Sequence, residues 1–578
     1  MAGAARGGGP SVAVEALLAA ALGVVLAVAV AGPDLPRLGG EVLGTANMDK
    51  WGAVYLHDQL YSSLAAGRLP FHDPDQLWPI GAPLAALNGS NSLEMLVSAA
   101  LRPFVGWPLW FNLAHLAWIP LNAAAMVPLA RRLWPDDRGL RFAAGATWAL
   151  SPVLLGEMAA GRLTQVALVG VPLAIRAFWD ASEGPVGRRG LALGAVGLAL
   201  TGLGYWYYAV FLGILAPVWL LRGAVLGRGR ATLAVFATIG VGAAVLVSPA
   251  LVAVVVSASG AGIDARGGLD PARLSPVFDN ALQLARAQPA QLVGWFPLAL
   301  APGLLLLGAR AVARGDRRAR VDAAVWLLLA ALCVVFALGP GQRFGDRVWL
   351  LPYWPLWRVL PLLGRLTHPS RWLDLGMVFL VVASFAGLAG GRLRRAAPLV
   401  PLALLAQLYV AGTAPLGTFA LAPQGVWKAV QAGKGALIVV PLLHSPETCR
   451  WQAFHHRPVL GGMVEGLPWA WPAAFRARVG GNPLLMQLVG LGDGRDARLD
   501  VRADDLAALR ADGFTQIVFD AESWRRWPRG GGVPMADRLS AALGAPLYRG
   551  EDGALWDLPR AAAPGSATAP ATARLPSP

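Results

Sequence analysis

The first loop after the first apolar run, residues 32–107, holds the densest group of titratable side chains outside the arginine-rich loops. The group comprises Asp49, His57, Asp58, His72, Asp73 and Asp75. A carboxylate next to a reacting hydroxyl can take its proton, and a general base placed in this way contributes about 10²–10⁴-fold in rate. Asp49 is the first candidate for such a base, and Asp58, beside His57, is the second. The ordinary alternatives are a solvated or backbone-capping Asp49 and a helix-surface Asp58.

The same loop is also compatible with a turn or a metal site. In His72-Asp73-Pro74-Asp75 the aspartates are typical of turns, where their side chains bond nearby backbone. His57, Asp58, His72 and Asp73 are ligand types that bind divalent metals, but their spacing matches no diagnostic metal motif. We therefore name no metal ligands and leave the cofactor unassigned, with a divalent metal as the open alternative.

Glu157 and Arg162 flank a short turn and form the next candidate pair. An ionised side chain close to a membrane span is costly unless it is paired or hydrated. The two residues are therefore either a structural ion pair or a functional one. In the functional case Glu157 is a second catalytic carboxylate and Arg162 binds a phosphate.

A second group of cations lies in residues 339–371, against a single acid, Asp346. The group comprises Arg343, Arg347, Arg358, Arg365, His368 and Arg371. The guanidinium fork of arginine suits bidentate binding of phosphate. Arg365, His368 and Arg371 are the candidates for phosphate binding, and the alternative is that they bind anionic lipid headgroups.

The composition indicates which kind of element positions these candidates. Of the 578 residues, 56% are hydrophobic and only 14% are charged, whereas soluble proteins average about 25% charged. The net charge of +15 would suit a nucleic-acid binder, but the apolar excess argues against that class. Two cysteines, Cys333 and Cys449, exclude a disulfide framework. The composition is that of a membrane protein.

Long apolar runs recur along the first 417 residues. A helix needs about 20 apolar residues to cross a bilayer, and residues 11–31 supply the first such run, with Glu15 as its only charge. Further runs bring the candidate spans to about eleven. They are 108–130, 142–157, 164–179, 190–204, 205–221, 231–256, 291–309, 321–338, 372–391 and 397–415.

Short arginine clusters occur in every second connection between these spans. Because arginine and lysine are concentrated in cytoplasmic loops, this pattern predicts a cytoplasmic N-terminus. Loops 32–107 and 339–371, the turn between Glu157 and Arg162, and the C-terminal portion then lie on the external side.

Residues 418–560 lack apolar runs of spanning length and predict a small external α/β domain. Its expected elements are strands over 435–443 and 515–520, a helix over 504–511, and a hairpin formed by 547–548 and 554–558. The tail, residues 561–578, is rich in Pro, Ala, Ser and Thr and is expected to be disordered.

Five segments carry a resemblance to a known superfamily. They are NMDKWGAVYLHDQL, GRLPFHDPDQLWPIGAPL, GRLTQVALVGVPLAI, LPLLGRLTHPSRWLDLGMVFLVVASFAGL and GALIVVPLL…RPVLGGM. The chain resembles the GT-C integral-membrane glycosyltransferases, in a bacterial branch near the dolichyl-phosphate-mannose mannosyltransferase-like and YfhO-like proteins. The resemblance implies a polytopic all-α bundle in a bacterial plasma membrane.

The resemblance also carries an expected activity. It implies a polyprenyl-phosphate-linked sugar donor and a glycan, lipid or protein acceptor on the external face. It further implies a catalytic carboxylate just after the first span, which by position is Asp49. The paired carboxylates of many members are absent at Asp49, and this departure is compatible with a non-catalytic relative.

Three other functions share this topology. They are a transporter or flippase for lipid-linked saccharides, a polysaccharide polymerase or ligase, and a non-catalytic scaffold in envelope assembly. Transporters place ionisable residues and broken helices at the membrane midplane within repeats. Nearly all charges in this chain lie at span ends or in loops, which favours the enzyme. No nucleic-acid partner is expected.

Overall fold

The computed structural model describes residues 11–558 apart from the gaps 89–92, 263–297, 314–315, 345–346, 361–362, 364–367, 391, 443–447, 464–470, 493–498 and 527–533. The chain divides into two compact units. The helical unit comprises Met1–Phe71, Leu84–Gly260 and Asp264–Leu421, and the sheet unit comprises His72–Pro83, Ala261–Ile263 and Ala422–Pro578. The tail predicted to be disordered, 561–578, lies outside the described residues.

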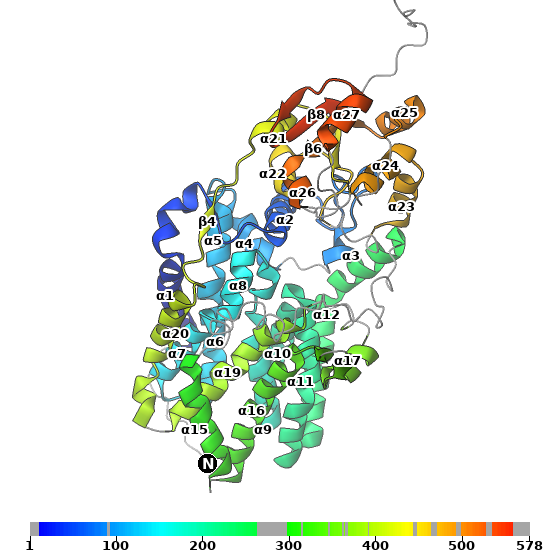
Figure 1. The fold of residues 1–578 in the computed structure, drawn as a ribbon. Coiled ribbons are helices and arrows are strands. Elements are labelled where there is room, and N and C mark those ends of the chain that lie inside the picture. Colours follow the sequence, from blue (N-terminus) through cyan, green and yellow to red (C-terminus); the bar gives the residue numbers. More distant parts are fainter. Residues whose placement is uncertain are drawn as a thin grey trace, which may run out of the picture. The chain divides into compact units, whose positions relative to one another are not determined.

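The helical unit contains seven described segments that are long and apolar enough to cross a membrane (Figure 1). They are Val12–Gly39, Leu109–Leu133, Leu163–Glu183, Trp206–Val225, Gly229–Ala261, Arg317–Ala337 and Pro369–Ala389. The protein is therefore a multi-pass membrane protein. The predicted all-α membrane bundle with a small α/β part is confirmed.

Four of the roughly eleven predicted spans are shorter or broken. The run 142–157 forms two helices, α7 (Arg138–Ala149) and α8 (Pro152–Ala160). Pro152 has no N–H and favours the first turn of a new helix. The other three predicted spans correspond to α10 (Arg188–Gly204), α15 (Ala301–Val312) and α20 (Leu399–Val410), with 17, 12 and 12 residues.

The spanning helices pack in a small number of close pairs. α1 (Val12–Ala31) packs on α6 (Trp118–Leu133), α9 (Gly170–Glu183) packs on α10, and α19 (Trp372–Ala389) packs on both α15 and α16 (Arg317–Ala337). Small residues let membrane helices approach closely, and a Cβ at Gly387 of α19 would come within 1.9 Å of the Gly303 carbonyl oxygen of α15. α19 is consequently buried on nearly all sides.

Shorter elements lie around one end of the bundle. They are α2 (Met48–Ala65), α3 (Leu84–Asn88), α4 (Leu93–Leu101), α5 (Leu109–Leu116), and β1 (Val42–Leu43), which pairs antiparallel with β4 (Thr418–Phe419). The remaining elements of this unit are α11 (Trp206–Val225), α12 (Gly229–Ala261), β2 (Gly341–Phe344), β3 (Arg347–Leu350) and α17 (Tyr353–Val359).

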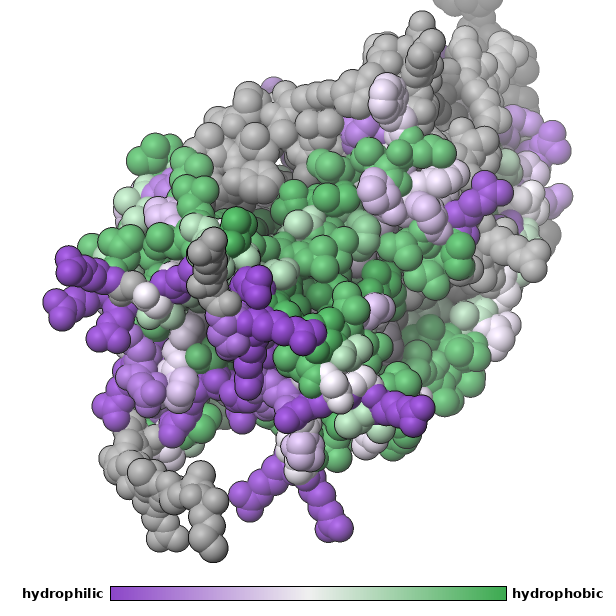
Figure 2. All heavy atoms as spheres, turned by 90° about the horizontal axis from the view of Figure 1, so that it is seen from below, coloured by the Kyte–Doolittle hydropathy of each residue, from purple (hydrophilic) through white to green (hydrophobic). Residues whose placement is uncertain are grey.

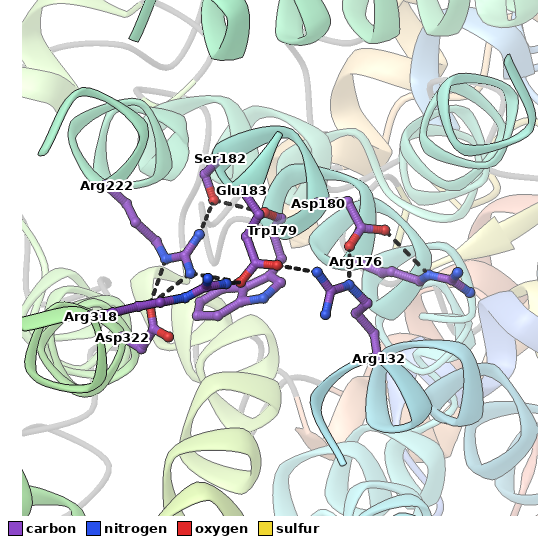
Figure 3. Close-up of polar contacts among 9 residues, drawn as sticks. All are labelled: Arg132, Arg176, Trp179, Asp180, Ser182, Glu183, Arg222, Arg318 and Asp322. Atoms are coloured by element: carbon purple, nitrogen blue, oxygen red, sulfur yellow. Dashed lines mark hydrogen bonds and ion pairs between the residues drawn. The ribbon is translucent and has the colours of Figure 1, made fainter. Parts of the chain in front are cut away.

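The opposite end of the bundle carries two ion networks. Glu15, in the first turn of α1, pairs with Arg131, Arg138 and Arg141. The second network, here called the arginine network, ties α6, α9, α11 and α16 together and consists of Arg132, Arg176, Asp180, Glu183, Arg222, Arg318 and Asp322 (Figure 3). From below the molecule, Figure 2 shows hydrophilic side chains gathered on one part of the surface and hydrophobic side chains over much of the rest.

The sheet unit is built on a four-stranded sheet of order β5-β6-β8-β7. β5 (Ala436–Val440) and β6 (Phe514–Asp520) are parallel, and β8 (Gly553–Asp557) is antiparallel to both β6 and β7 (Tyr548–Gly550). The helices are α21 (Gly425–Gln431), α22 (Thr448–His455), α23 (Ala473–Gly480), α24 (Pro483–Gly492), α25 (Ala503–Ala511), α26 (Ala521–Arg526) and α27 (Met535–Leu543). The strands, the helix α25 and the closing hairpin lie where the sequence predicted them.

Candidate functional site

The start of α2 and the end of α8 meet in the helical unit. Asn47 caps α2, because its side-chain oxygen accepts a hydrogen bond from the Lys50 N–H at 2.9 Å. The cap places Asp49 in the first turn, where the helix dipole favours negative charge. α8 ends at Gly161, which is left-handed with φ +84°, so the chain turns and presents Arg162 towards the start of α2.

Arg162 joins two carboxylates that come from different parts of the chain. Its Nη1 lies 2.8 Å from Oδ2 of Asp49, and its Nε donates to Oε2 of Glu157. We call Asp49, Glu157 and Arg162 the carboxylate–arginine cluster. The predicted Glu157–Arg162 pair is present, and Asp49 is added to it.

The three side chains differ in exposure. The Asp49 side chain is 56% exposed, that of Arg162 is 34% exposed, and that of Glu157 is 14% exposed. Burial lowers the pKa of Arg162, but its interactions with Glu157 and Asp49 outweigh burial and leave that pKa raised. Arg162 therefore stays charged, and Asp49 keeps a carboxylate surface open to a bound molecule.

A second group of polar side chains interacts electrostatically with Glu157. It consists of Tyr205, Tyr208, Arg371 and Asp374. Arg371 Nη1 donates to the Tyr205 hydroxyl, and its guanidinium carbon lies 5.1 Å from the Tyr205 ring centroid. The Tyr208 hydroxyl lies 2.6 Å from Oδ2 of the fully buried Asp374. Oδ1 of Asp374 is buried without a hydrogen-bond partner among the described residues.

Sequence reasoning missed Lys50, Tyr205, Tyr208 and Asp374. A signal for Asp374 was available, because it is the lone acid in the apolar run 372–391. An ionisable residue inside a membrane helix marks a functional site by default. The two tyrosines gave no comparable signal, since tyrosine is common where helices meet the membrane surface.

Asp58, the second predicted carboxylate, lies away from the cluster. It follows Asp49 in α2 by about 13 Å of helix rise and on the opposite face. Its Oδ1 lies 2.6 Å from Nη2 of Arg102, whose guanidinium also lies 4.3 Å from the Tyr61 ring centroid. The structure thus places Asp58 in an ion pair with Arg102, on the face of α2 opposite Asp49.

The histidines and acids considered for a metal do not gather. Asp73 lies in the sheet unit and accepts a hydrogen bond from the Asp75 N–H at 2.9 Å, as in the turn that the sequence predicted. His57 lies in α2, with its Nδ1 2.5 Å from the Ser98 hydroxyl. Among the residues that the structure describes, no three His, Cys, Asp or Glu side chains form a group that could hold a metal ion.

The structure brings two of the four predicted phosphate-binding residues into interaction with Glu157. Arg162 and Arg371 both interact electrostatically with Glu157. His368 is half-buried and directly precedes the short 3-10 helix Pro369–Arg371. Arg365 lies outside the described residues.

In its overall course the chain is similar to solved membrane glycosyltransferases. One is the archaeal oligosaccharyltransferase AglB from Archaeoglobus fulgidus in complex with an inhibitory peptide and a dolichol-phosphate, at 12% identity and a TM-score of 0.49, over 88% of this chain and 69% of that one. Another is the arabinofuranosyltransferase AftD from Mycobacteria, at 18% identity and 0.49, over 88% and 36%. A third is ArnT from Cupriavidus metallidurans bound to undecaprenyl phosphate, at 11% identity and 0.49, over 95% and 98%.

No protein-family model and no curated protein matches this sequence. The structural similarities have low identities and TM-scores below 0.5.

Proposed function

We propose that this chain is a membrane glycosyltransferase that moves a sugar from a polyprenyl-phosphate-linked donor to a hydroxyl-bearing acceptor. The acceptor is a glycan, a lipid or a protein. The reaction takes place at the external face of a bacterial plasma membrane, with the N-terminus in the cytoplasm and the sheet unit outside.

Asp49 acts as the general base in this proposal. In the transfer, the acceptor oxygen attacks the anomeric carbon of the sugar, and the bond from that carbon to the phosphate oxygen breaks. The acceptor hydroxyl gives its proton to Asp49, and the polyprenyl phosphate leaves with the bonding electron pair. A half-exposed carboxylate fixed by Arg162 at 2.8 Å is suited to this role, because it is both held in place and accessible.

The cations stabilise the leaving phosphate in this proposal. Arg162 and Arg371 both interact electrostatically with the carboxylate of Glu157. A guanidinium binds phosphate through two parallel hydrogen bonds. Glu157 then keeps both arginines oriented, and His368 is a further candidate for contact with the phosphate.

The observation that carries the proposal is the convergence of Asp49 and Glu157 on one arginine. Arg162 bonds Asp49 across 113 residues of sequence. A purely structural surface pair contributes little to stability, about 0–1 kcal/mol. The arrangement instead concentrates two carboxylates and a fixed cation next to a partly open surface, where they can serve as a base and as a partner for developing negative charge in group transfer.

The test is transfer by the purified full-length protein in lipid nanodiscs, from a panel of radiolabelled polyprenyl-phosphate sugars. Asp49→Asn should lower transfer at least about 10²-fold, while Asp58→Asn, on the far side of α2, should retain it. Loss of transfer in Asp58→Asn alone would move the base to Asp58. Binding of polyprenyl phosphate without transfer from any donor would refute the enzyme and favour a flippase or a scaffold.

A further inference from the structure

Lys50 directly follows Asp49 in α2 and has no role in the proposed chemistry. The chain has 49 basic residues, of which only Lys50, Lys428 and Lys434 are lysines. Lys50 is 0% exposed, whereas Lys428 and Lys434 in the sheet unit are exposed. Arginine stays protonated when buried, but lysine can lose its proton. The one fully buried lysine therefore stands out in a chain that otherwise uses arginine.

The Lys50 ammonium contacts the last turn of α8. Its Nζ lies 3.1 Å from the backbone oxygen of Met158. Carbonyls at the end of a helix lack partners within the helix, and a cation there is favoured by the helix dipole. The Phe111 ring, whose centroid lies 5.7 Å from Nζ, covers the ammonium from another side.

The segment that starts α2 binds neighbouring carbonyls of the same α8 turn. The Thr45 N–H donates to the Ala159 oxygen at 2.9 Å, next to the Met158 oxygen that Lys50 contacts. The Glu157 oxygen accepts from the Arg162 N–H at 2.9 Å. Thr45 and Lys50 thus bond two adjacent carbonyls at the end of α8, close to the turn that carries Arg162, the partner of Asp49.

Gly161 lets the two segments approach closely. A Cβ at this position would lie 2.7 Å from Cα of Lys50, 3.1 Å from its Cδ and 3.2 Å from its Cε. The positive φ of +84° also requires glycine. Gly161 therefore packs directly against the backbone and side chain of Lys50, at the turn that leads into Arg162.

From this geometry we propose that Lys50 is a titratable positioning residue of the carboxylate–arginine cluster. Its ammonium holds the start of α2, and with it Asp49, against the end of α8. The inference rests on the proposed function for its effect on transfer, whereas the ionisation of Lys50 can be measured without any activity.

The electrostatic surroundings of Lys50 support this inference. Burial, followed by the charge of Arg162, lowers the pKa of Lys50 from 10.5 to about 7. The other titratable groups that face it are His57, on its own helix, and His115, on α5. Burial and then Lys50 lower the pKa of His57 to about 3, so His57 is neutral near pH 7 and Arg162 is the charged neighbour that tunes Lys50.

The first arm of the test measures the ionisation and does not depend on any activity. Full-length protein labelled with ¹³C at the lysine Cε gives one signal for each of its three lysines, and Lys428→Arg and Lys434→Arg assign the two exposed ones. The Lys50 signal should titrate with a midpoint near pH 7. Arg162→Gln should raise that midpoint. Arg102→Gln, which removes the partner of Asp58 just after α4, should leave it unchanged. A Lys50 midpoint that Arg162→Gln does not move would overturn the proposal.

The second arm measures transfer as a function of pH. Above its midpoint the wild type loses the charge-assisted bond to Met158, so kcat should fall as the pH rises. Lys50→Arg, which keeps its charge, should retain kcat and lose this pH dependence. Lys50→Met should lower kcat about 10-fold to 100-fold, the size of a small misplacement of a catalytic group, with little change in the donor KM.

The two arms separate the failure of this inference from the failure of the proposed function. Wild-type protein without transfer from any donor would refute the glycosyltransferase, and the ¹³C titration would still decide the role of Lys50. Wild-type kcat in Lys50→Met, or an unchanged pH dependence in Lys50→Arg, would refute the positioning role in an active enzyme. Lys428→Met is the matched control, because it removes an exposed lysine, and it should behave as the wild type.

Discussion

The two ends of the helical bundle use the same side chains in opposite ways. In the arginine network, Glu183 accepts from Arg132, Arg222 and Arg318, and the side chain of Arg222 is 0% exposed (Figure 3). In the carboxylate–arginine cluster, one arginine serves two carboxylates, and one of them, Asp49, is 56% exposed. Charges that satisfy one another around a buried arginine join helices together, whereas a partly open carboxylate with one arginine partner is available to a substrate.

The geometry around Arg222 shows why the first end is structural. Its guanidinium contacts Ser182 at 2.6 Å, Glu183 at 2.9 Å and Asp322 at 2.7 Å, and lies 3.8 Å from the Trp179 ring centroid. These partners come from α9 and α16, so one side chain on α11 links three helices. A buried charge is tolerated only when its partners are this complete.

Removing Arg222 should produce the largest loss of stability. A small loss would contradict the structural role of the arginine network. Arg222→Met leaves the carboxylates of Glu183 and Asp322 without their buried partner. Breaking a buried ion pair from one side costs about 3–5 kcal/mol. Thermal unfolding in detergent should show a large drop in melting temperature, while Arg320→Met, at an exposed arginine of α16, should unfold as the wild type does.

A smaller loss is expected next to the cluster, at Tyr208. Its hydroxyl is the hydrogen-bond partner of Oδ2 of the buried Asp374, at 2.6 Å, and Oδ1 has none among the described residues. Tyr208→Phe leaves the whole carboxyl group unpaired, which costs about 1–3 kcal/mol. The same unfolding assay measures it, and a melting temperature equal to that of the wild type would show that Asp374 is hydrated or paired in another way.

The smallest effect is a pH-dependent difference in stability between the wild type and Lys50→Met. Burial, followed by Arg162, lowers the pKa of Lys50 from 10.5 to about 7. Between these values the unfolded chain binds a proton at Lys50 that the folded chain does not bind. The free energy of unfolding of the wild type, relative to Lys50→Met, therefore rises with pH through this window and stays at its lower level below it.

Differential melting measured at about pH 6.5 and about pH 9.5 checks this sign. The melting temperature of the wild type minus that of Lys50→Met should be larger at the higher pH. An equal difference at both pH values would mean that Lys50 keeps the same protonation state in the folded and unfolded chains. In that case Lys50 would be a purely structural contact, like the buried charges of the arginine network.

Much of the fold could be predicted because it follows from local properties of the sequence. The apolar run 11–31 gave the bounds of α1 to within one residue, and the boundary between α10 and α11 falls at Tyr205, where the predicted spans 190–204 and 205–221 meet. The break between α7 and α8 was overlooked, since the run 142–157 is apolar throughout most of its length. Pro152 was the local signal for that break.

The site was predictable only in part, because its assembly depends on contacts between distant segments. The Glu157–Arg162 pair is local and was predicted, whereas the Asp49–Arg162 contact spans 113 residues. The burial of Lys50 could not be derived from its neighbours in sequence, since it follows Asp49 in a polar helix turn. Asp58 is an aspartate of α2 like Asp49, but the two side chains lie on opposite faces of the helix and therefore meet different partners.

The most direct test of the account compares one carboxylate from each end of the bundle. Transfer from a polyprenyl-phosphate sugar and the melting temperature are measured together for Asp49→Asn and Glu183→Gln. The account predicts that Asp49→Asn lowers kcat at least about 10²-fold without changing the melting temperature, and that Glu183→Gln lowers the melting temperature while the folded fraction keeps its kcat. Wild-type kcat in Asp49→Asn would contradict the account.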